Sequence, residues 1–228
     1  MIDFHAHVLP GVDHGSHDIA ESGAQLALLK QAGVQTVVAS SHFYPAQHTV
    51  DGYLERASRA LTQIREEIAP ESRPQLCRGA EVLLCESLDK MEGIERLCVE
   101  GTSCMLLELP FASWSDALID TAFRMIQGKF TVVLAHIDRY RDRLDMIHEM
   151  LDAGAYAQLN AEGLCGMFAA KRWQDYLTQG RVVALGSDLH GADRKAVERF
   201  AALQKKLGEN GARVMQASEA LLADAVRY

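Results

Sequence analysis

The chain has 228 residues, of which 48% are hydrophobic and 24% charged, a composition typical of an ordinary soluble globular protein. It excludes a disordered, collagen-like or coiled-coil chain, and the length suffices for one domain with a sizeable core. The formal net charge of −8 disfavours a surface that coats nucleic acid.

Short apolar runs alternate with longer amphipathic segments along the chain, which is typical of strands alternating with helices. In chain order, the runs predict strands at Ile2–Phe4, Val34–Ala39, Leu76–Leu83, Met105–Leu109, Phe130–Ala135, Ala155–Leu159 and Arg181–Leu185. The segments predict helices at Ala20–Gln31, Asp51–Ile68, Ser115–Gln127, Arg141–Asp152, Ala169–Gln179, Arg194–Leu207 and Ser218–Val226. Ser115 and Ser218 suit N-caps. About seven βα units with strands apolar on both faces predict a single α/β domain, either a barrel or a doubly wound sheet.

The first residues lack the basic start of a signal peptide, and no apolar run reaches the roughly 18 residues that span a bilayer. Five cysteines are scattered along the chain without a CxxC pair, which fits a reducing compartment. We therefore expect a cytoplasmic protein without membrane insertion. The cysteines, which we interpret as packing residues, are Cys77, Cys85, Cys98, Cys104 and Cys165. No CxxxxxR loop is present, which excludes phosphatase chemistry with a cysteine nucleophile.

Titratable side chains recur at the carboxyl ends of these strands, where α/β barrels carry their chemistry. His5 and His7 form an HxH, and residues two apart share one side of an extended strand. The other such residues, in chain order, are His14, His42, Glu81, Glu108, His136, Asp188 and His190. His17, His48 and His148 fit no strand end, and we interpret them as solvated.

Imidazole and carboxylate groups bind divalent ions such as Mn²⁺, Fe²⁺ and Zn²⁺. A lone HxH, or one Glu at a strand end, is more often a core or rim residue than a ligand. Nine such residues on one face exceed the needs of one ion, so the pattern predicts a site for two or three ions. Glu81 is the best candidate for a carboxylate that bridges a pair of them.

The motifs HxHxLPGxD, SSH, GAE, LLELP, AHIDRY and SDLH resemble those of the PHP (polymerase and histidinol phosphatase) superfamily. Their order and spacing are most similar to its bacterial protein-tyrosine phosphatases of capsule and exopolysaccharide systems. The resemblance implies that residues 1–228 form a single PHP-type metal-dependent phosphatase domain with a distorted (β/α)₇ TIM-like barrel. It also implies three divalent ions, usually assigned Mn²⁺, with Fe or Zn as alternatives.

The same resemblance implies a ligand set for each ion. The first would be held by His5, His7, Glu81 and Asp188, the second by Glu81, Glu108 and His136, and the third by His14, His42 and His190. His14 stands where the phosphatase subfamily typically has a carboxylate, which leaves a third site made of histidines. Arg139 and Arg194 match arginines that these phosphatases place near the phosphate.

The function implied is hydrolysis of phosphotyrosine on a bacterial tyrosine kinase of polysaccharide export. Three alternatives remain: another PHP phosphoesterase, such as a histidinol-phosphate or small-molecule phosphatase, a metal-binding module without activity, and a nuclease. The acidic composition makes the nuclease the weakest of these. Four aromatic residues that follow ligand-bearing strands are candidates to line the mouth of the site: Phe43, Tyr44, Phe111 and Trp114.

Overall fold

The computed structural model describes residues 1–112, 114–164 and 169–223. Its strands are β1 (Ile2–His7), β2 (Thr36–Ala39), β3 (His42–Phe43), β4 (Gln75–Arg78), β5 (Glu81–Leu83), β6 (Cys104–Glu108), β7 (Thr131–Leu134), β8 (Tyr156–Asn160), β9 (Val182–Gly186) and β10 (Leu189–His190). Its α-helices are α1 (Ile19–Gln31), α2 (Val50–Glu67), α3 (Asp116–Ile126), α4 (Leu144–Asp152), α5 (Ala169–Arg172), α6 (Gln174–Thr178), α7 (Arg194–Leu207) and α8 (Glu209–Ala223). The predicted alternation of strands and helices is confirmed.

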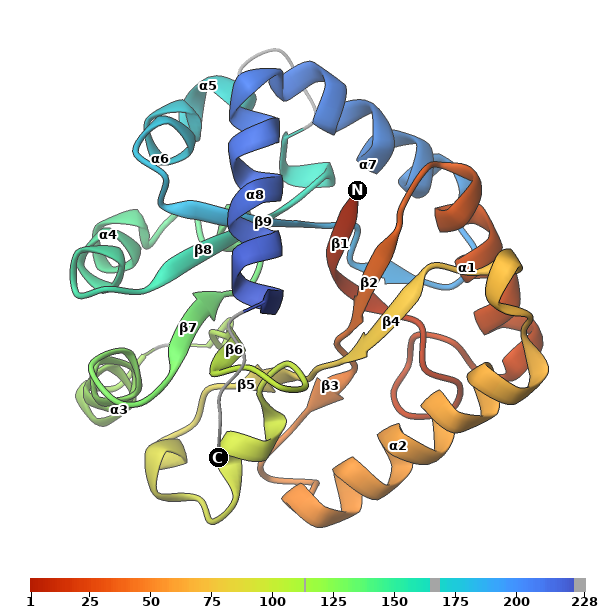
Figure 1. Ribbon diagram of the computed structural model, residues 1–228. Coiled ribbons are helices and arrows are strands. Elements are labelled where there is room, and N and C mark those ends of the chain that lie inside the picture. The colour runs from red at the N-terminus through yellow and green to blue at the C-terminus, as the bar shows by residue number, and fades with distance from the viewer. Residues whose placement is uncertain (113, 165–168, 224–228) are drawn as a thin grey trace.

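The strands form two parallel sheets, with α1 to α7 around their outside (Figure 1). One sheet has the order β10-β1-β2-β4 and the other the order β3-β5-β6-β7-β8-β9. The chain passes directly from the first sheet to the second between β2 and β3, and again between β4 and β5. Near the junction of β9 and β10, the backbone N–H of Asp188 donates to the carbonyl of His5 at 2.8 Å. The fold is thus a single α/β domain built on parallel strands.

The prediction of one strand at Leu76–Leu83 was wrong, because this run divides into β4 and β5 in different sheets. The break falls at Gly79, where a Cβ atom would lie 2.8 Å from Cγ1 of Val38. The glycine therefore permits a close approach of the two chain segments. The break brings Glu81 of β5 directly opposite His42 of β3.

Two helix predictions also differ from the structure. The segment Ala169–Gln179 is divided into α5 and α6. The last helix begins at Glu209 rather than at Ser218, and Val226 lies outside the described residues. Ser218 is buried within α8, and its hydroxyl donates to the carbonyl of Val183 at 2.7 Å. Ser218 therefore does not mark the start of a helix, although serine is a common N-cap residue. Ser115 does cap α3, because its Oγ accepts from the N–H of Leu118.

An apolar cluster fills the interior near the amino ends of the strands. Its members are Ile2, Phe4, Val38, Val99, Cys104, Leu106, Val133, Ala135, Val183 and Ala184. Helix α8 crosses this end of the strands, as Figure 1 shows, and packs Met215 and Leu222 against the cluster. The N–H of Ile2 donates to Sδ of Met215 at 3.4 Å. Helix α8 thus covers the amino ends of the strands, and the polar site lies at their opposite, carboxyl ends.

Strand β1 contains an irregularity that changes which side its residues face. Asp3 pairs with Val37 and Ala6 with Ala39, so three steps along β1 match two along β2. Such an extra residue is a β-bulge, which re-aims the side chains that follow it. Phe4 lies in the interior apolar cluster, and the next residue, His5, also points inward, to the polar site above it.

None of the described helices is long and apolar enough to cross a membrane. Cys77, Cys85, Cys98 and Cys104 are free and at least partly buried, and burial raises the pKa of each thiol. These four therefore remain protonated at neutral pH, as expected of packing residues. Cys165 lies outside the described residues.

Candidate metal centre

The carboxyl ends of the strands bring all nine predicted metal ligands into one cluster. They come from β1 (His5 and His7), the following loop (His14), β3 (His42), β5 (Glu81), β6 (Glu108), the end of β7 (His136), the β9–β10 junction (Asp188) and β10 (His190). Within it, three groups offer atoms close enough together to hold an ion. The groups are His5, His7 and Glu81; His42, Glu81 and Glu108; and His7, His42 and His190.

Glu81 lies at the centre of the cluster and is fully buried. Its Oε2 is 3.1 Å from Nε2 of His5, 3.2 Å from Nε2 of His7 and 2.9 Å from Nδ1 of His42. Its Oε1 is 2.7 Å from Nε2 of His136. Burial alone would raise the pKa of Glu81, but the surrounding imidazoles lower it well below the usual value. Contacts in several directions are what a bridging carboxylate requires.

Glu108 and Asp188 complete the acidic part of the cluster. The Oε2 of Glu108 is 3.7 Å from Nδ1 of His42, and Oδ1 of Asp188 is 3.3 Å from Nε2 of His7. Burial and the charge of Glu81 raise the pKa of Glu108 to about 7. Two carboxylates held together in a buried site repel each other, and a cation between them would relieve this repulsion.

Hydrogen bonds outside the cluster orient the two histidines of β1. Nδ1 of His7 lies 2.7 Å from Oδ2 of Asp13, and Nδ1 of His5 lies 3.2 Å from Oε1 of Gln158. Since both partners are acceptors, each histidine donates from Nδ1 and turns Nε2 to the cluster. Burial alone would lower the pKa of His7, but its contacts with Asp13, Asp188 and Glu81 raise it well above the usual value. The two Nε2 atoms are only 3.1 Å apart.

This donor set fits divalent metal ions. Imidazole nitrogens and carboxylate oxygens, which are the usual ligands of such ions, meet within a buried space. Glu81 Oε2 and His42 Nδ1 lie 2.9 Å apart, yet neither makes a well-aligned hydrogen bond. Buried polar atoms without hydrogen bonds are rare in native proteins, and ligation of a cation satisfies them.

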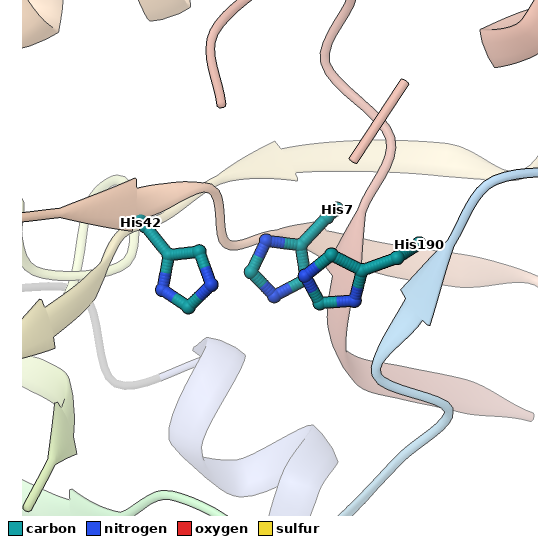
Figure 2. Close-up of side chains that lie close together, drawn as sticks. All are labelled: His7, His42 and His190. Carbon is teal, nitrogen blue, oxygen red and sulfur yellow. The ribbon is translucent and has the colours of Figure 1, made fainter. Parts of the chain in front are cut away.

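Three histidines face one another at one end of the cluster (Figure 2). The rings of His7 and His190 stack with centroids 3.9 Å apart, and those of His7 and His42 are 4.5 Å apart. The exposed His14 stacks on His42 at 4.9 Å and on His190 at 4.7 Å. Burial and the neighbouring His7 lower the pKa of His190 to about 4, so this imidazole is neutral at neutral pH.

Two of the predicted ligands have strained backbones. His136 and Asp188 adopt φ angles of 31° and 51°, in the left-handed region that disfavours residues with a Cβ. The N–H of His136 donates to Oε1 of Gln158 at 2.7 Å, which holds the strained residue in place. Strain of this kind is concentrated at functional sites.

Comparison with known proteins agrees with this geometry. The sequence model of a family described as capsular polysaccharide synthesis, CpsB/CapC, matches residues 1–222. The chain belongs to the CpsB/CapC family. Tyrosine-protein phosphatase YwqE of Bacillus subtilis (strain 168) is 24% identical over 220 residues, which cover 91% of this chain and 85% of that protein. Putative tyrosine-protein phosphatase CapC of Staphylococcus aureus is 26% identical over 178 residues, which cover 74% of this chain and 67% of CapC.

Solved structures extend the similarity to the fold. One match comes from the crystal structures of YwqE from Bacillus subtilis and CpsB from Streptococcus pneumoniae, described as unique metal-dependent tyrosine phosphatases. It has a TM-score of 0.79 at 20% identity and covers 100% of this chain and 96% of that chain. A β-aspartyl dipeptidase from Fervidobacterium islandicum reaches only 0.51 at 13% identity, over 94% of this chain and 72% of the dipeptidase. At these identities the likeness concerns the fold alone.

In this CpsB/CapC member, sequence reasoning missed three residues that support the cluster. Asp13 holds His7 and also accepts from the N–H of His42 at 2.8 Å. Gln158 donates from Nε2 to Asn160, whose Nδ2 donates to Oδ2 of Asp188 at 2.8 Å. The spacing of Gln158 and Asn160 could have indicated this role, because two polar residues that are two positions apart in a strand face the same side of the sheet.

The two predicted phosphate-binding arginines have different surroundings. The guanidinium of Arg139 forms an ion pair with Asp188, and its side chain is 40% exposed. Arg139 thus lies at the edge of the cluster with donors left for another group. Arg194 is the exposed first residue of α7, and its side chain makes no hydrogen bond or ion pair with the described residues. Its role at a phosphate remains a prediction.

Exchanging Asp13 for asparagine should weaken metal binding in this CpsB/CapC member. The amide of Asp13→Asn can donate to Nδ1 of His7, which would move the imidazole proton to Nε2 and block its lone pair. We expect metal affinity to fall by about 10- to 100-fold, the usual effect of losing such a supporting contact. Calorimetric metal titration of the apoprotein measures it, with the exposed Asp142→Asn as control. Unchanged affinity would contradict the role assigned to Asp13.

Proposed function

We propose that residues 1–228 form a single PHP-type, metal-dependent protein-tyrosine phosphatase domain. Its substrate would be phosphotyrosine on a bacterial tyrosine kinase that regulates capsular or exopolysaccharide synthesis. The observation that carries the proposal is the convergence of nine candidate metal ligands in one cluster, six of them in groups that could hold an ion, in a chain of the CpsB/CapC family. The YwqE, CpsB and CapC relatives are named as tyrosine-protein phosphatases, which supports the choice of substrate. The four cysteines among the described residues are free thiols, which supports a cytoplasmic location.

The same proposal treats the two sheets as parts of one distorted (β/α)₇ barrel. In support, β2 and β3 are separated only by Ser40 and Ser41, and β4 and β5 only by Gly79 and Ala80. Each of these two pairs of short strands therefore counts as one strand of the ring. The carboxylate of Asp3 in β1 accepts from the N–H of Ser187 at 2.9 Å, beside β9. This contact supports a link between the first and last strands of the ring.

Three divalent ions, Mn²⁺ with Fe or Zn as alternatives, would occupy the cluster. His5, His7, Glu81 and Asp188 would hold the first, Glu81, Glu108 and His136 the second, and His14, His42 and His190 the third. When bound, such ions neutralise the charge of a phosphate dianion and lower the pKa of a water molecule to near neutrality.

The chain's own residues then bind and orient the substrate. Arg139 would present two parallel N–H donors to the equatorial phosphate oxygens, a geometry that lysine lacks. Its ion pair with Asp188 holds the guanidinium at the edge of the cluster. Arg194 would contribute to phosphate binding from the start of α7. The leaving phenolate has a pKa of about 10 and is a good leaving group.

A cavity of about 500 Å³ beside the cluster supports recognition of an aromatic substrate. It is lined by Phe111, Asp138, Arg139, Arg141, Asn160, Glu162 and Gly163. Phe111 is 64% exposed and stacks on Tyr140 with centroids 5.5 Å apart. Its free face would receive the tyrosine ring while Arg139 receives the phosphate. Phe43, by contrast, is fully buried, so its expected place in the mouth was wrong.

Removing the ring of Phe111 should therefore affect aromatic substrates selectively. Aromatic stacking contributes up to about 1.5 kcal/mol, so Phe111→Ala should raise KM for a phosphotyrosine peptide by roughly tenfold. Steady-state kinetics should show no matching change for glycerol phosphate, which has no ring. The control is Tyr156→Ala, which removes another exposed aromatic residue at the opposite, amino end of β8. An equal effect on both substrates would contradict ring recognition.

A substrate panel tests the proposed function itself. The metal-loaded protein should hydrolyse a phosphotyrosine peptide with a higher kcat/KM than histidinol phosphate or an oligonucleotide. Preference for histidinol phosphate or another small ester would instead favour a different PHP phosphoesterase. No turnover of any of the three would favour a metal-binding module without activity.

A further inference from the structure

Three arginines lie close together in the segment that follows β7, and they differ in their partners. Arg139 forms an ion pair with Asp188. Nε of Arg143 lies 3.7 Å from Oδ2 of Asp142. Arg141 is exposed, and its guanidinium forms no ion pair with the described residues. In a chain with 31 acidic and 23 basic residues, Arg141 thus keeps a positive charge that is open to a ligand.

Arg141 is held in place although it lacks a charged partner. Its Nε donates to the carbonyl of Asp138 at 3.2 Å, so the backbone of its own segment orients the guanidinium. The turn that follows is fixed as well, because Cζ of Arg143 lies 4.5 Å from the ring centre of Trp114. Nε1 of Trp114 in turn donates to the carbonyl of Pro110 at 2.7 Å. A side chain oriented in advance loses little conformational freedom when it binds a ligand.

Arg141 lines the same cavity as Arg139 and Phe111. Strands β6, β7 and β8 are neighbours in their sheet, so the segments that follow them meet around this cavity. In the proposed function, Arg139 receives the phosphate and Phe111 the tyrosine ring, which leaves Arg141 to the neighbouring residues of the substrate. A round cavity of about 500 Å³ is about 10 Å across, a distance that three residues of extended chain cover.

The cavity also contains negative charge, but this charge does not neutralise Arg141. Glu162 is exposed and lines the cavity, yet it forms no ion pair with Arg141 or with another cation of the described residues. The carboxylate of Asp138 is buried, and its Oδ1 accepts from the N–H of Asn160 at 2.9 Å. An anionic group of a ligand would therefore be attracted to Arg141 and repelled by Glu162.

We propose that Arg141 binds the carboxylate of an acidic residue within about three positions of the phosphotyrosine. The substrate would then be a phosphotyrosine in an acidic segment. This inference rests on the proposed function, because Arg139 and Phe111 set the position of the phosphotyrosine. The planar fork of arginine matches a carboxylate with two parallel hydrogen bonds. Since Arg141 is exposed, salt screens the pair, and its main effect is on the choice of substrate.

Matched phosphotyrosine peptides test the proposal. They differ only in one residue, which is glutamate, glutamine or lysine, placed in turn at each of the three positions before and after the phosphotyrosine. With the metal-loaded protein, the glutamate peptide should have a kcat/KM about fivefold above that of the glutamine peptide at one position or more. This ratio should approach one at about 0.5 M salt. Equal kcat/KM values at every position would overturn the proposal.

Substitution of Arg141 assigns the preference to this side chain. Arg141→Gln should make the glutamate and glutamine peptides equal, and Arg141→Glu should make the lysine peptide the best of the three. Arg199→Gln is the matched control, because Arg199 is an exposed arginine that lines another cavity beside the cluster. Each ratio compares peptides on one preparation, so a general loss of metal or fold cancels. The proposal is wrong if both Arg141 variants keep the preference, or if Arg199→Gln loses it.

A binding measurement separates this proposal from the proposed function. In a phosphonate peptide, a methylene group replaces the ester oxygen of phosphotyrosine, so the peptide cannot be hydrolysed. Fluorescence anisotropy with such peptides should give a Kd about fivefold lower for the glutamate than for the glutamine version. If no phosphotyrosine peptide is hydrolysed, the proposed function fails, and the ratio of Kd values still decides this inference. If both versions are hydrolysed and bound equally, the inference fails and the proposed function stands.

Discussion

Removal of divalent metal should abolish phosphotyrosine hydrolysis, and added Mn²⁺ should restore it. Arg139 pairs with Asp188, but Glu81 and Glu108 have no lysine or arginine partner among the described residues, so these two carboxylates would repel a phosphate dianion in the absence of cations. The ions are needed both to bind the phosphate and to lower the pKa of water. The loss should be complete within the sensitivity of a phosphate-release assay.

The experiment requires exhaustive chelation, elemental analysis of the apoprotein and a circular dichroism spectrum before and after. The spectrum separates loss of metal from loss of fold. Added Mg²⁺ serves as a comparison, because it prefers oxygen ligands in octahedral geometry and should restore less activity than Mn²⁺. Activity that persists in protein free of metal would refute the proposed mechanism.

Glu81→Gln should lower kcat by roughly 100-fold or more, in the range seen when a principal electrostatic group is lost. The carboxylate contacts His5, His7 and His42 through one oxygen and His136 through the other. Glutamine nearly keeps the shape but removes one negative charge between two cations. Its amide nitrogen also brings donors toward the groups that must ligate. We expect at least one ion to be lost.

Metal counting and steady-state kinetics on the same preparation test this prediction. The control is Glu66→Gln on the exposed side of α2, which makes the same chemical change far from the cluster. A thermal melt of each variant shows whether the fold is retained. Full metal content with near-normal kcat in Glu81→Gln would show that this carboxylate does not bridge two ions.

The sequence predicted which side chains lie together, because the carboxyl ends of parallel strands meet. His5 and Glu108 are about a hundred positions apart in the chain, yet each follows an apolar run, and that rule alone places both at one end of the sheets. The supporting residues were harder to find. Gln158 and Asn160 are uncharged and carry no ligand signature, and Asp13 reaches His7 only through the fold of the loop between them.

The errors in the fold have a common physical origin in contacts between distant segments. The division at Gly79 depends on the approach of Val38 from another strand, which no local pattern reveals. Ser218 carries the residue type of a helix start, but its hydroxyl is satisfied by Val183. The bulge in β1 is also invisible to a period-two rule, which would place Phe4 and His5 on opposite sides.

The position of α8 has a consequence for how the protein is made. Ribosomes release the amino-terminal part first, and every strand precedes Glu209 in the chain. A nascent chain can therefore assemble all its strands while the apolar cluster around Ile2 and Phe4 still faces water, because Met215 and Leu222 have not yet emerged. Exposed apolar surface of this kind recruits chaperones and promotes aggregation. Chaperones of the producing cell would thus recognise this apolar surface until α8 is synthesised and packs against it, after the strands that carry the candidate metal ligands have been made.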